Sequence, residues 1–156
     1  MNKLEATLIE IERVVGSGSV LTDRDVLESY ARDESEAAPH LPDAVVRAQR
    51  TQDVVAVMRA ASRHGIPVTP RAGGTGRTGG AVPVAGGIVL AFERCNRIKG
   101  IEPEDLTAVA EPGVITGQFH TAVEEHGHAA LGGGRGDAAA PVPRQQTLII
   151  DERMIG

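Results

Sequence analysis

The residues with the clearest chemical potential form a glycine-rich run at positions 69–80, TPRAGGTGRTGG, in which five of the last eight residues are glycine. Glycine permits positive φ and lets successive main-chain N–H groups point into one concavity, where they bind anionic oxygen. Thr75 and Thr78 add hydroxyl donors, and Arg71 or Arg77 adds a guanidinium that suits a phosphate. The run therefore predicts a phosphate or pyrophosphate site, against the alternative of a flexible loop.

Two widespread phosphate motifs do not fit this run. Residues 74–79 match GxGxxG, but that motif has to open a helix, and the next residues, GAVPVAGG at 80–87, contain a proline and three glycines. The acidic residue expected about 20 positions further on, at a strand end, is also missing. A P-loop needs GK[ST] after its glycines, which this chain lacks. The pattern disfavours both a dinucleotide Rossmann site and a P-loop.

The other reactive residue types do not assemble a second site. Cys95 is the single cysteine, which excludes an internal disulfide and favours a small buried residue over a reactive thiol. His120, His126 and His128 fall on different faces of a predicted helix end and its exit, without carboxylates or thiolates to complete a metal shell. We expect no metal site, and the sequence names no catalytic residue.

The glycine run follows a predicted βαβ unit and lies between the second strand of that unit and the next strand along the chain. Residues 44–49 form a β-branched strand, a helix follows from Thr51 to Gly65, and residues 66–70 return to extended structure. The crossover makes these two strands parallel. Residues 87–92 form a further strand, whose almost unbroken apolar character indicates burial on both faces.

Further elements flank this unit. They are a helix carrying an apolar stripe over 4–15, a polar helix from Thr22 or Asp23 to near Asp33, a hairpin of 98–101 with 107–110, and a helix capped by Thr116 that ends near Gly127. Prolines at 39 and 42 make the segment before the first strand an extended connector. The fold class is therefore α+β, with a small parallel sheet flanked by helices.

Composition narrows the function classes. The chain has 156 residues, 16 Lys and Arg against 21 Asp and Glu, and a net charge of −5, so it offers no chain-wide basic field for nucleic acid. Its apolar stretches fall short of the ~20 residues that a membrane helix needs, and its first residues carry acids where a signal peptide would be apolar. We expect one soluble, cytoplasmic domain.

The stretch from 42 to 127, centred on VVRAQRTQDVVAVMRAASRHGIPVTPRAGGTGRTGGAVP, resembles the first half of the FAD-binding domain of FAD-linked oxidases of the p-cresol methylhydroxylase (PCMH) and vanillyl-alcohol oxidase type. The YARD sequence at 30–33 matches the family's lead-in, and EPGV at 111–114 follows in order. Within the family the chain is most similar to glycolate oxidase large subunits and D-lactate dehydrogenases. The resemblance implies a helical lead-in at 1–41, a PCMH-type half-domain at 42–127 and a non-homologous, disordered tail at 128–156.

The resemblance also implies which residues hold the cofactor. In the family the glycine loop wraps the FAD pyrophosphate through main-chain amides, and the segment like EPGV lies along the cofactor. The corresponding residues here are Arg71, Ala72, Gly73, Gly74, Thr75, Gly76, Thr78 and Gly79 for the first role, and Pro112 and Gly113 for the second. Some members attach the flavin to a histidine near this loop. Because no histidine lies between His64 and His120, we expect FAD to be non-covalent.

After Gly127 the family continues with a segment that completes the FAD cradle and then with a substrate domain. This chain instead reads HAALGGGRGDAAAPVPRQQTLIIDERMIG, which lacks those features. Two functions remain open. The first is the FAD-binding portion of a flavin-dependent oxidoreductase acting on a 2-hydroxy acid of the glycolate or D-lactate type, truncated and inactive alone unless a separate polypeptide supplies the missing half. The alternative is a nucleotide- or anion-binding remnant without turnover.

Overall fold

A computed structural model of the protein describes residues 2–126. The predicted tail at 128–156, including His128, lies outside these residues. The chain divides between Cys95 and Asn96 into two compact units. Among residues 2–126, no helix is both long enough and apolar enough to cross a membrane.

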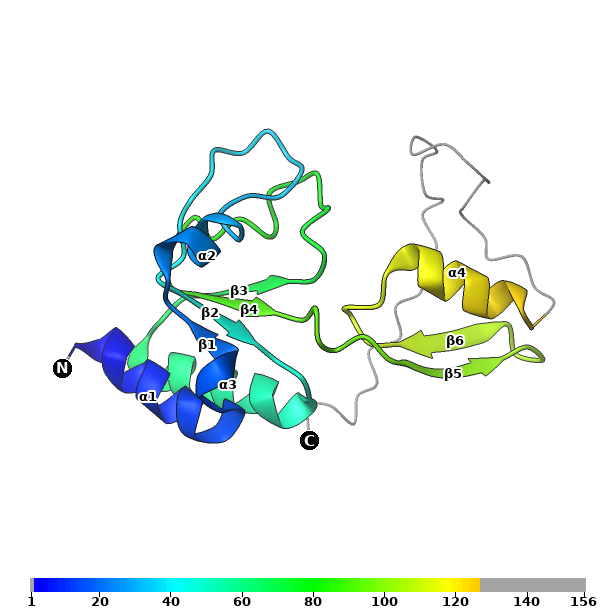
Figure 1. The fold of residues 1–156 in the computed structure, drawn as a ribbon, viewed down its shortest axis with the longest axis horizontal. Helices are drawn as coiled ribbons and strands as arrows, with labels where there is room; N and C mark the ends of the chain where they lie inside the picture. The colour runs from blue at the N-terminus through cyan, green and yellow to red at the C-terminus, as the bar shows by residue number, and fades with distance from the viewer. Residues whose placement is uncertain (1, 127–156) are drawn as a thin grey trace. The chain divides into compact units, whose positions relative to one another are not determined.

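The first unit is built on a four-stranded sheet in the order β1-β2-β4-β3 (Figure 1). Strands β2 (Ala44–Arg47), β4 (Ile88–Ala91) and β3 (Val68–Arg71) are parallel, and the two-residue strand β1 (Val20–Leu21) pairs antiparallel with β2. Helix α3 (Thr51–His64) connects β2 to β3 and ends at Gly65 in the left-handed conformation. The predicted parallel βαβ unit and its α+β class are confirmed.

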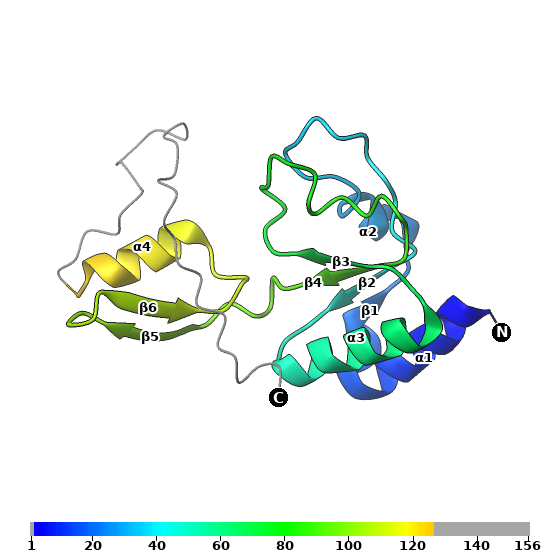
Figure 2. The same ribbon diagram turned by 180° about the vertical axis from the view of Figure 1, so that it is seen from behind.

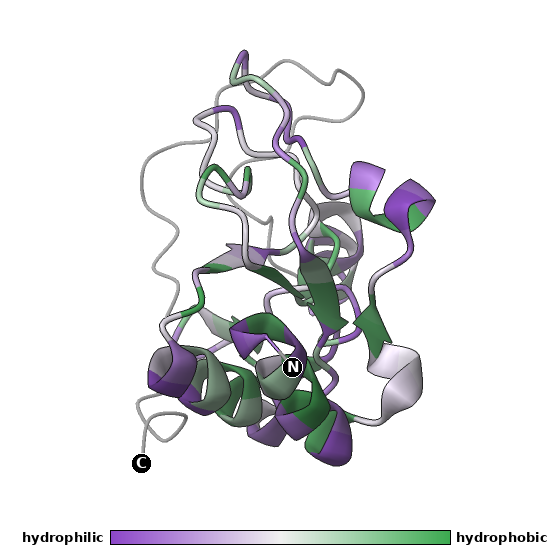
Figure 3. Ribbon diagram, turned by 90° about the vertical axis from the view of Figure 1, so that its left-hand side faces the viewer, coloured by the Kyte–Doolittle hydropathy of each residue, from purple (hydrophilic) through white to green (hydrophobic). Residues whose placement is uncertain are grey.

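Both faces of this sheet are covered. Helices α1 (Lys3–Val15) and α3 lie side by side on one face, seen from both sides in Figures 1 and 2, and bury Ile11 and Val57 against the strands. The short helix α2 (Arg24–Glu28) covers the other face, where Leu27 packs with Val45 and Val89. The central strands are correspondingly the most apolar part of the ribbon (Figure 3). This double covering explains why β4 is apolar throughout.

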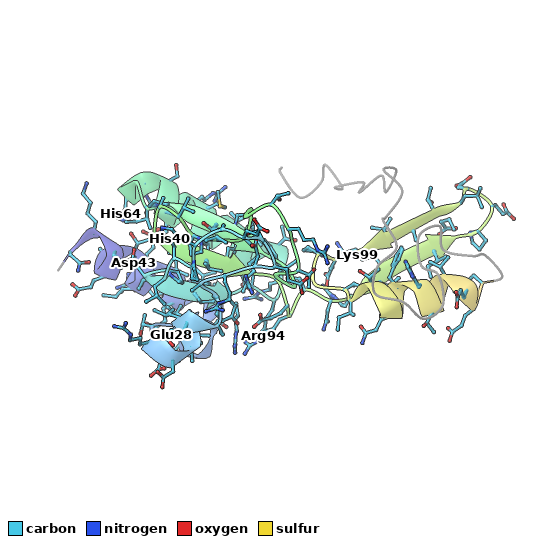
Figure 4. The ribbon with its side chains drawn as sticks, turned by 90° about the horizontal axis from the view of Figure 1, so that it is seen from above. Glu28, His40, Asp43, His64, Arg94 and Lys99 are labelled. Atoms are coloured by element: carbon cyan, nitrogen blue, oxygen red, sulfur yellow. The ribbon has the colours of Figure 1, made fainter. Side chains whose placement is uncertain are left out.

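An ion-pair cluster joins the two helices of the first face. Glu10 Oε1 of α1 accepts a hydrogen bond of 2.6 Å from Arg63 Nη1 of α3. The other carboxylate oxygen of Glu10 lies 3.6 Å from His64 Nε2. Figure 4 labels His64 at the end of α3. Because these groups are partly exposed, the ion pairs add little to the stability of the helix packing.

Helix α2 is shorter than the sequence predicts. Asp23 caps it as expected, accepting from the amides of the second and third residues, but the helix ends at Glu28 rather than near Asp33. The Ser29 hydroxyl bonds back to the Val26 carbonyl at 2.7 Å, and the next amides make tighter i→i+3 bonds. These local bonds compete with the helical ladder and end it early.

The second unit, described up to residue 126, contains a hairpin and a helix. Strands β5 (Ile98–Glu102) and β6 (Thr107–Ala110) pair antiparallel with an irregularity between Ile98 and Gly100, and helix α4 (Thr116–Glu124) follows. The hairpin and helix are confirmed. The predicted cap is wrong, because Thr116 is the first helical residue and Ile115 stands at the cap without a side-chain bond.

Candidate functional site

The glycine loop, residues 72–87, leaves the carboxyl end of β3 and returns to the start of β4. Carboxyl ends of parallel strands are the edge at which open α/β sheets bind ligands. No helix begins anywhere in the loop. The structure therefore agrees with the exclusion of a Rossmann phosphate site, in which the glycines must open a helix.

The main chain of this loop is rich in unused donors. Within residues 2–126, none of the N–H groups of residues 72–80 donates a hydrogen bond, whereas those of Ala81 and Val82 bond to Asp33 and to the Gly79 carbonyl. Most of the loop is also exposed. Exposed N–H groups bond to water in the free chain and remain available to anionic oxygens of a ligand.

The loop glycines fall into two classes. Gly74, Gly79, Gly86 and Gly87 adopt positive φ, of +70°, +77°, +66° and +74°. Gly73, Gly76 and Gly80 do not. A Cβ atom on Gly73 would come no closer than 3.9 Å to another residue's atoms, and one on Gly76 would lie 3.7 Å from Asp33 Oδ2. A Cβ atom at either position would thus make only ordinary van der Waals contact, so the fold itself does not require glycine there.

A lead-in segment, residues 29–37, lies against the glycine loop. The Glu34 amide donates to the Gly76 carbonyl at 3.0 Å, and Asp33 Oδ2 accepts from the Ala81 amide at 3.4 Å. The hydroxyl and amide of Ser35, together with the Ala81 amide, hold the pKa of Asp33 below its usual value. Asp33 is therefore a carboxylate at neutral pH that shapes one side of the loop.

Arg71, the last residue of β3, directs its side chain to the lead-in segment. Its Nη1 donates to the Arg32 carbonyl at 2.7 Å, and its guanidinium carbon stands 5.6 Å from the centroid of the Tyr30 ring. The other loop arginine, Arg77, is exposed and forms no hydrogen bond or ion pair with any residue from 2 to 126. Of the two guanidinium groups predicted to suit a phosphate, that of Arg71 already contacts the lead-in segment, and that of Arg77 has no partner among residues 2–126.

A second polar cluster lies at the same edge of the sheet and was not predicted. The Tyr30 hydroxyl donates to Glu93 at 2.9 Å and accepts from Arg47 Nε at 3.1 Å, while Arg47 and Glu93 form an ion pair of 2.6 Å. Burial raises the pKa of Tyr30, and Glu93 raises it further against the lowering effect of Arg47. The residues are 17 to 63 positions apart, so no local pattern could connect them.

Pro112 and Gly113 belong to the second unit, directly after β6. Glu111, just before them, accepts bonds from both the amide and the guanidinium of Arg97, at 2.9 and 2.8 Å. Its side chain is 8% exposed. These bonds hold the pKa of Glu111 below its usual value and fix where the EPGV segment begins. The eight predicted pyrophosphate residues lie in the first unit, at the end of β3 and in the glycine loop. Pro112 and Gly113 lie in the second unit, directly after the anchored Glu111.

The remaining candidates add no site in the described part of the chain. No three His, Cys, Asp or Glu side chains gather there in a way that could hold a metal ion. Cys95 is buried, with its Sγ 3.3 Å from the Ala48 carbonyl oxygen, as predicted for a small core residue. His126 is exposed, and its Nδ1 lies 2.8 Å from the Ala122 carbonyl oxygen.

Comparison with known proteins points to one cofactor. A family model described as an FAD binding domain matches residues 42–138. The glycolate oxidase subunit GlcD of Bacillus subtilis is 39% identical over 98 residues, which cover 63% of this chain and 21% of that protein. A D-2-hydroxyglutarate dehydrogenase of Stutzerimonas stutzeri is 34% identical over 122 residues, covering 78% and 26%.

The fold is shared with a solved structure as well. p-Cresol methylhydroxylase with substrate bound superimposes with a TM-score of 0.72 at 28% identity, covering 80% of this chain and 25% of that one. The chain therefore spans about a fifth to a quarter of the length of the proteins it matches. The shared part includes the whole glycine loop.

Proposed function

Because this chain belongs to the FAD binding domain family, we propose that its glycine loop holds the pyrophosphate of non-covalently bound FAD through main-chain N–H groups. The family's proteins related to this chain are flavin oxidoreductases. The residues proposed for the pyrophosphate are Arg71, Ala72, Gly73, Gly74, Thr75, Gly76, Thr78 and Gly79.

The run of unpaired amides from 72 to 80 carries this proposal. A diphosphate brings several strong acceptor oxygens and negative charge, and main-chain donors bind such groups without a basic patch. Gly73 and Gly76 fit the same proposal, because the fold itself does not require glycine at either position and a ligand packed on the backbone would occupy the volume where a side chain would begin. Thr75 and Thr78, both exposed, add hydroxyl donors.

Pro112 and Gly113 are proposed to lie along the same cofactor, and this assignment is supported by the sequence resemblance of EPGV. The Arg97–Glu111 bonds support it indirectly, since they fix the main chain immediately before Pro112. FAD, when bound, supplies the two-electron acceptor that oxidoreductases of this kind use. The protein's own contribution in the described residues is binding and orientation.

The substrate proposal is a 2-hydroxy acid of the glycolate or D-lactate type. It is supported by the likeness to the glycolate oxidase subunit and the D-2-hydroxyglutarate dehydrogenase. The described residues include no group to which we assign a catalytic role. We therefore expect this chain to be inactive alone, with turnover requiring a further polypeptide that supplies the rest of the cofactor and substrate site.

The proposal is tested by titrating the purified chain with FAD and, in parallel, with riboflavin, which lacks the pyrophosphate. We expect FAD to bind and riboflavin to bind far more weakly, with no reduction of a dye acceptor by glycolate or D-lactate. Equal binding of the two flavins would contradict the pyrophosphate assignment. Substrate-dependent dye reduction by the chain alone would contradict the proposed incompleteness, and would leave the FAD assignment standing.

A further inference from the structure

We propose that the Arg71 side chain is a positioning residue that fastens the lead-in segment, residues 29–37, onto the glycine loop, and that Gly74 lacks a side chain because the Arg71 guanidinium fills that place. The consequence for cofactor affinity rests on the proposed function. The structural claim concerns the ligand-free chain and stands independently of it.

The Arg71 guanidinium binds the end of helix α2. Nη1 donates to the Arg32 carbonyl at 2.7 Å, Nη2 reaches the Ser29 carbonyl at 3.5 Å, and the group stacks over the Tyr30 ring between them. Carbonyls beyond a helix C-terminus lack partners in the helix and attract cations. A planar guanidinium can serve two carbonyls and an aromatic face at once, which an ammonium cannot.

Gly74 makes room for this guanidinium. A Cβ atom at Gly74 would stand 2.2 Å from Nη2, 2.3 Å from Cζ and 2.7 Å from Nη1 of Arg71. Real side chains do not approach so closely, so any other residue at 74 would displace the guanidinium from its contacts. The φ of Gly74, +70°, is a further strain for any other residue. Gly74 therefore serves the Arg71 contact, whereas Gly73 and Gly76 have no comparable neighbour among residues 2–126.

Two other contacts continue the attachment along the segment. The Glu34 amide donates to the Gly76 carbonyl at 3.0 Å, and a Cβ on Gly79 would lie 3.4 Å from the Ala37 Cβ. The lead-in segment thus contacts the chain at several points from Arg71 to Ala81, which is the first part of the glycine loop. If the Arg71 contacts are lost, the remaining contacts between the lead-in segment and the loop become weaker. The loop then loses the support that holds its amides in one arrangement.

The same geometry argues against the Arg71 side chain as a phosphate ligand, so the contribution of Arg71 to the proposed pyrophosphate site is limited to its main chain. A guanidinium that holds the Arg32 carbonyl and stacks on Tyr30 would have to leave both contacts to reach an anion. Arg77 has no such commitment within residues 2–126 and is the matched control for a direct charge effect. Loss of a positioning residue weakens binding without changing its salt dependence, whereas loss of a phosphate contact reduces the salt dependence.

The test is a double-mutant cycle on the full chain, with Arg71→Met, Gly74→Ala and the pair, measured by urea unfolding without FAD. Each single variant should lose stability, and the pair should lose little more than Gly74→Ala alone, because the guanidinium contacts can be lost only once. Gly18→Ala, at a position with open space and no positive φ, is the control and should add independently to Arg71→Met. Additive losses for Arg71→Met and Gly74→Ala would overturn the proposal.

Hydrogen exchange supplies the local readout. Arg71→Met should speed amide exchange in the segment 29–37 by about tenfold or more, with core strands β2 and β4 unchanged at low urea. Unchanged exchange in that segment would overturn the proposal. Arg71→Lys should restore exchange only partly, and full restoration would contradict the requirement for a guanidinium.

FAD titrations then separate this proposal from the one it rests on. If the wild-type chain binds FAD, Arg71→Met should bind about tenfold more weakly with an unchanged salt slope. Equal affinity, or a reduced salt slope, would contradict the positioning role. If the wild-type chain does not bind FAD, the proposed function fails while the stability cycle and the exchange data still decide the role of Arg71.

Discussion

The main chain of Gly87 passes so close to Pro67 that a Cβ atom on Gly87 would lie 2.3 Å from the Pro67 carbonyl oxygen. Gly87 also has a φ of +74°, and its amide donates to Asp43 Oδ2 at 2.7 Å. The end of the glycine loop thus contacts Pro67, just before β3, and Asp43, just before β2. Figure 4 labels Asp43 in this part of the first unit. Gly87 is thus required by the fold.

Gly87→Ala should therefore destabilise the protein by about 2–4 kcal/mol, the sum of left-handed strain and a collision with rigid backbone. Urea unfolding measures the loss, with Gly18→Ala as the control. Loss of less than about 0.5 kcal/mol would mean that the β3 entry moves freely, contrary to the packing described here.

Glu111 gives a pH-dependent prediction. Arg97 lowers the pKa of the folded carboxyl below the unfolded value, so the stabilisation is complete above the unfolded pKa and is lost as pH falls through the folded one. Glu111→Gln should cost about 1–2 kcal/mol near neutral pH and less near pH 3. Stability of both proteins at the two pH values checks this. An equal difference at both would show that the carboxylate charge contributes nothing.

Tyr30 can be followed alone, because it is the single tyrosine and the chain has no tryptophan. Burial, with Glu93, raises the pKa of Tyr30 above the usual value for tyrosine, so the phenol of the folded chain should ionise at higher pH than that of the urea-unfolded chain. Ultraviolet absorbance of the phenolate measures both titrations. Glu93→Gln should lower the folded pKa and Arg47→Met should raise it. Shifts in the opposite directions would contradict the cluster geometry.

The sequence predicted the parts of the fold that local patterns encode. Periodicity located α1, α3 and the three parallel strands, and glycine spacing located the loop that joins β3 to β4. The pattern could not reveal β1, because two residues carry no period. It also predicted α2 to be too long. The Ser29 hydroxyl bonds to the Val26 carbonyl and so favours the end of the helix over its continuation, a preference that composition does not reveal.

The sequence predicted the glycine loop, but not the contacts of the side chains around it. Glycine content indicated a loop of main-chain donors, whereas the direction of Arg71 depends on where the end of α2 lies, which is set by tertiary packing. The sequence GGTG likewise does not show that the surroundings of Gly74 and Gly76 differ. They depend on neighbours from residues 71 and 33, which the fold brings to the loop.

The central claim is that bare main chain in the glycine loop, with the space beside Gly76, receives the FAD pyrophosphate. Calorimetric titration of FAD into the wild-type chain and into Gly76→Ala tests it most directly. A methyl at 76 has room in the fold, so unfolding stability should change by less than about 0.5 kcal/mol, while FAD affinity should fall by at least about tenfold. Gly18→Ala should change neither. Equal FAD affinity in the Gly76→Ala and wild-type chains would contradict the account.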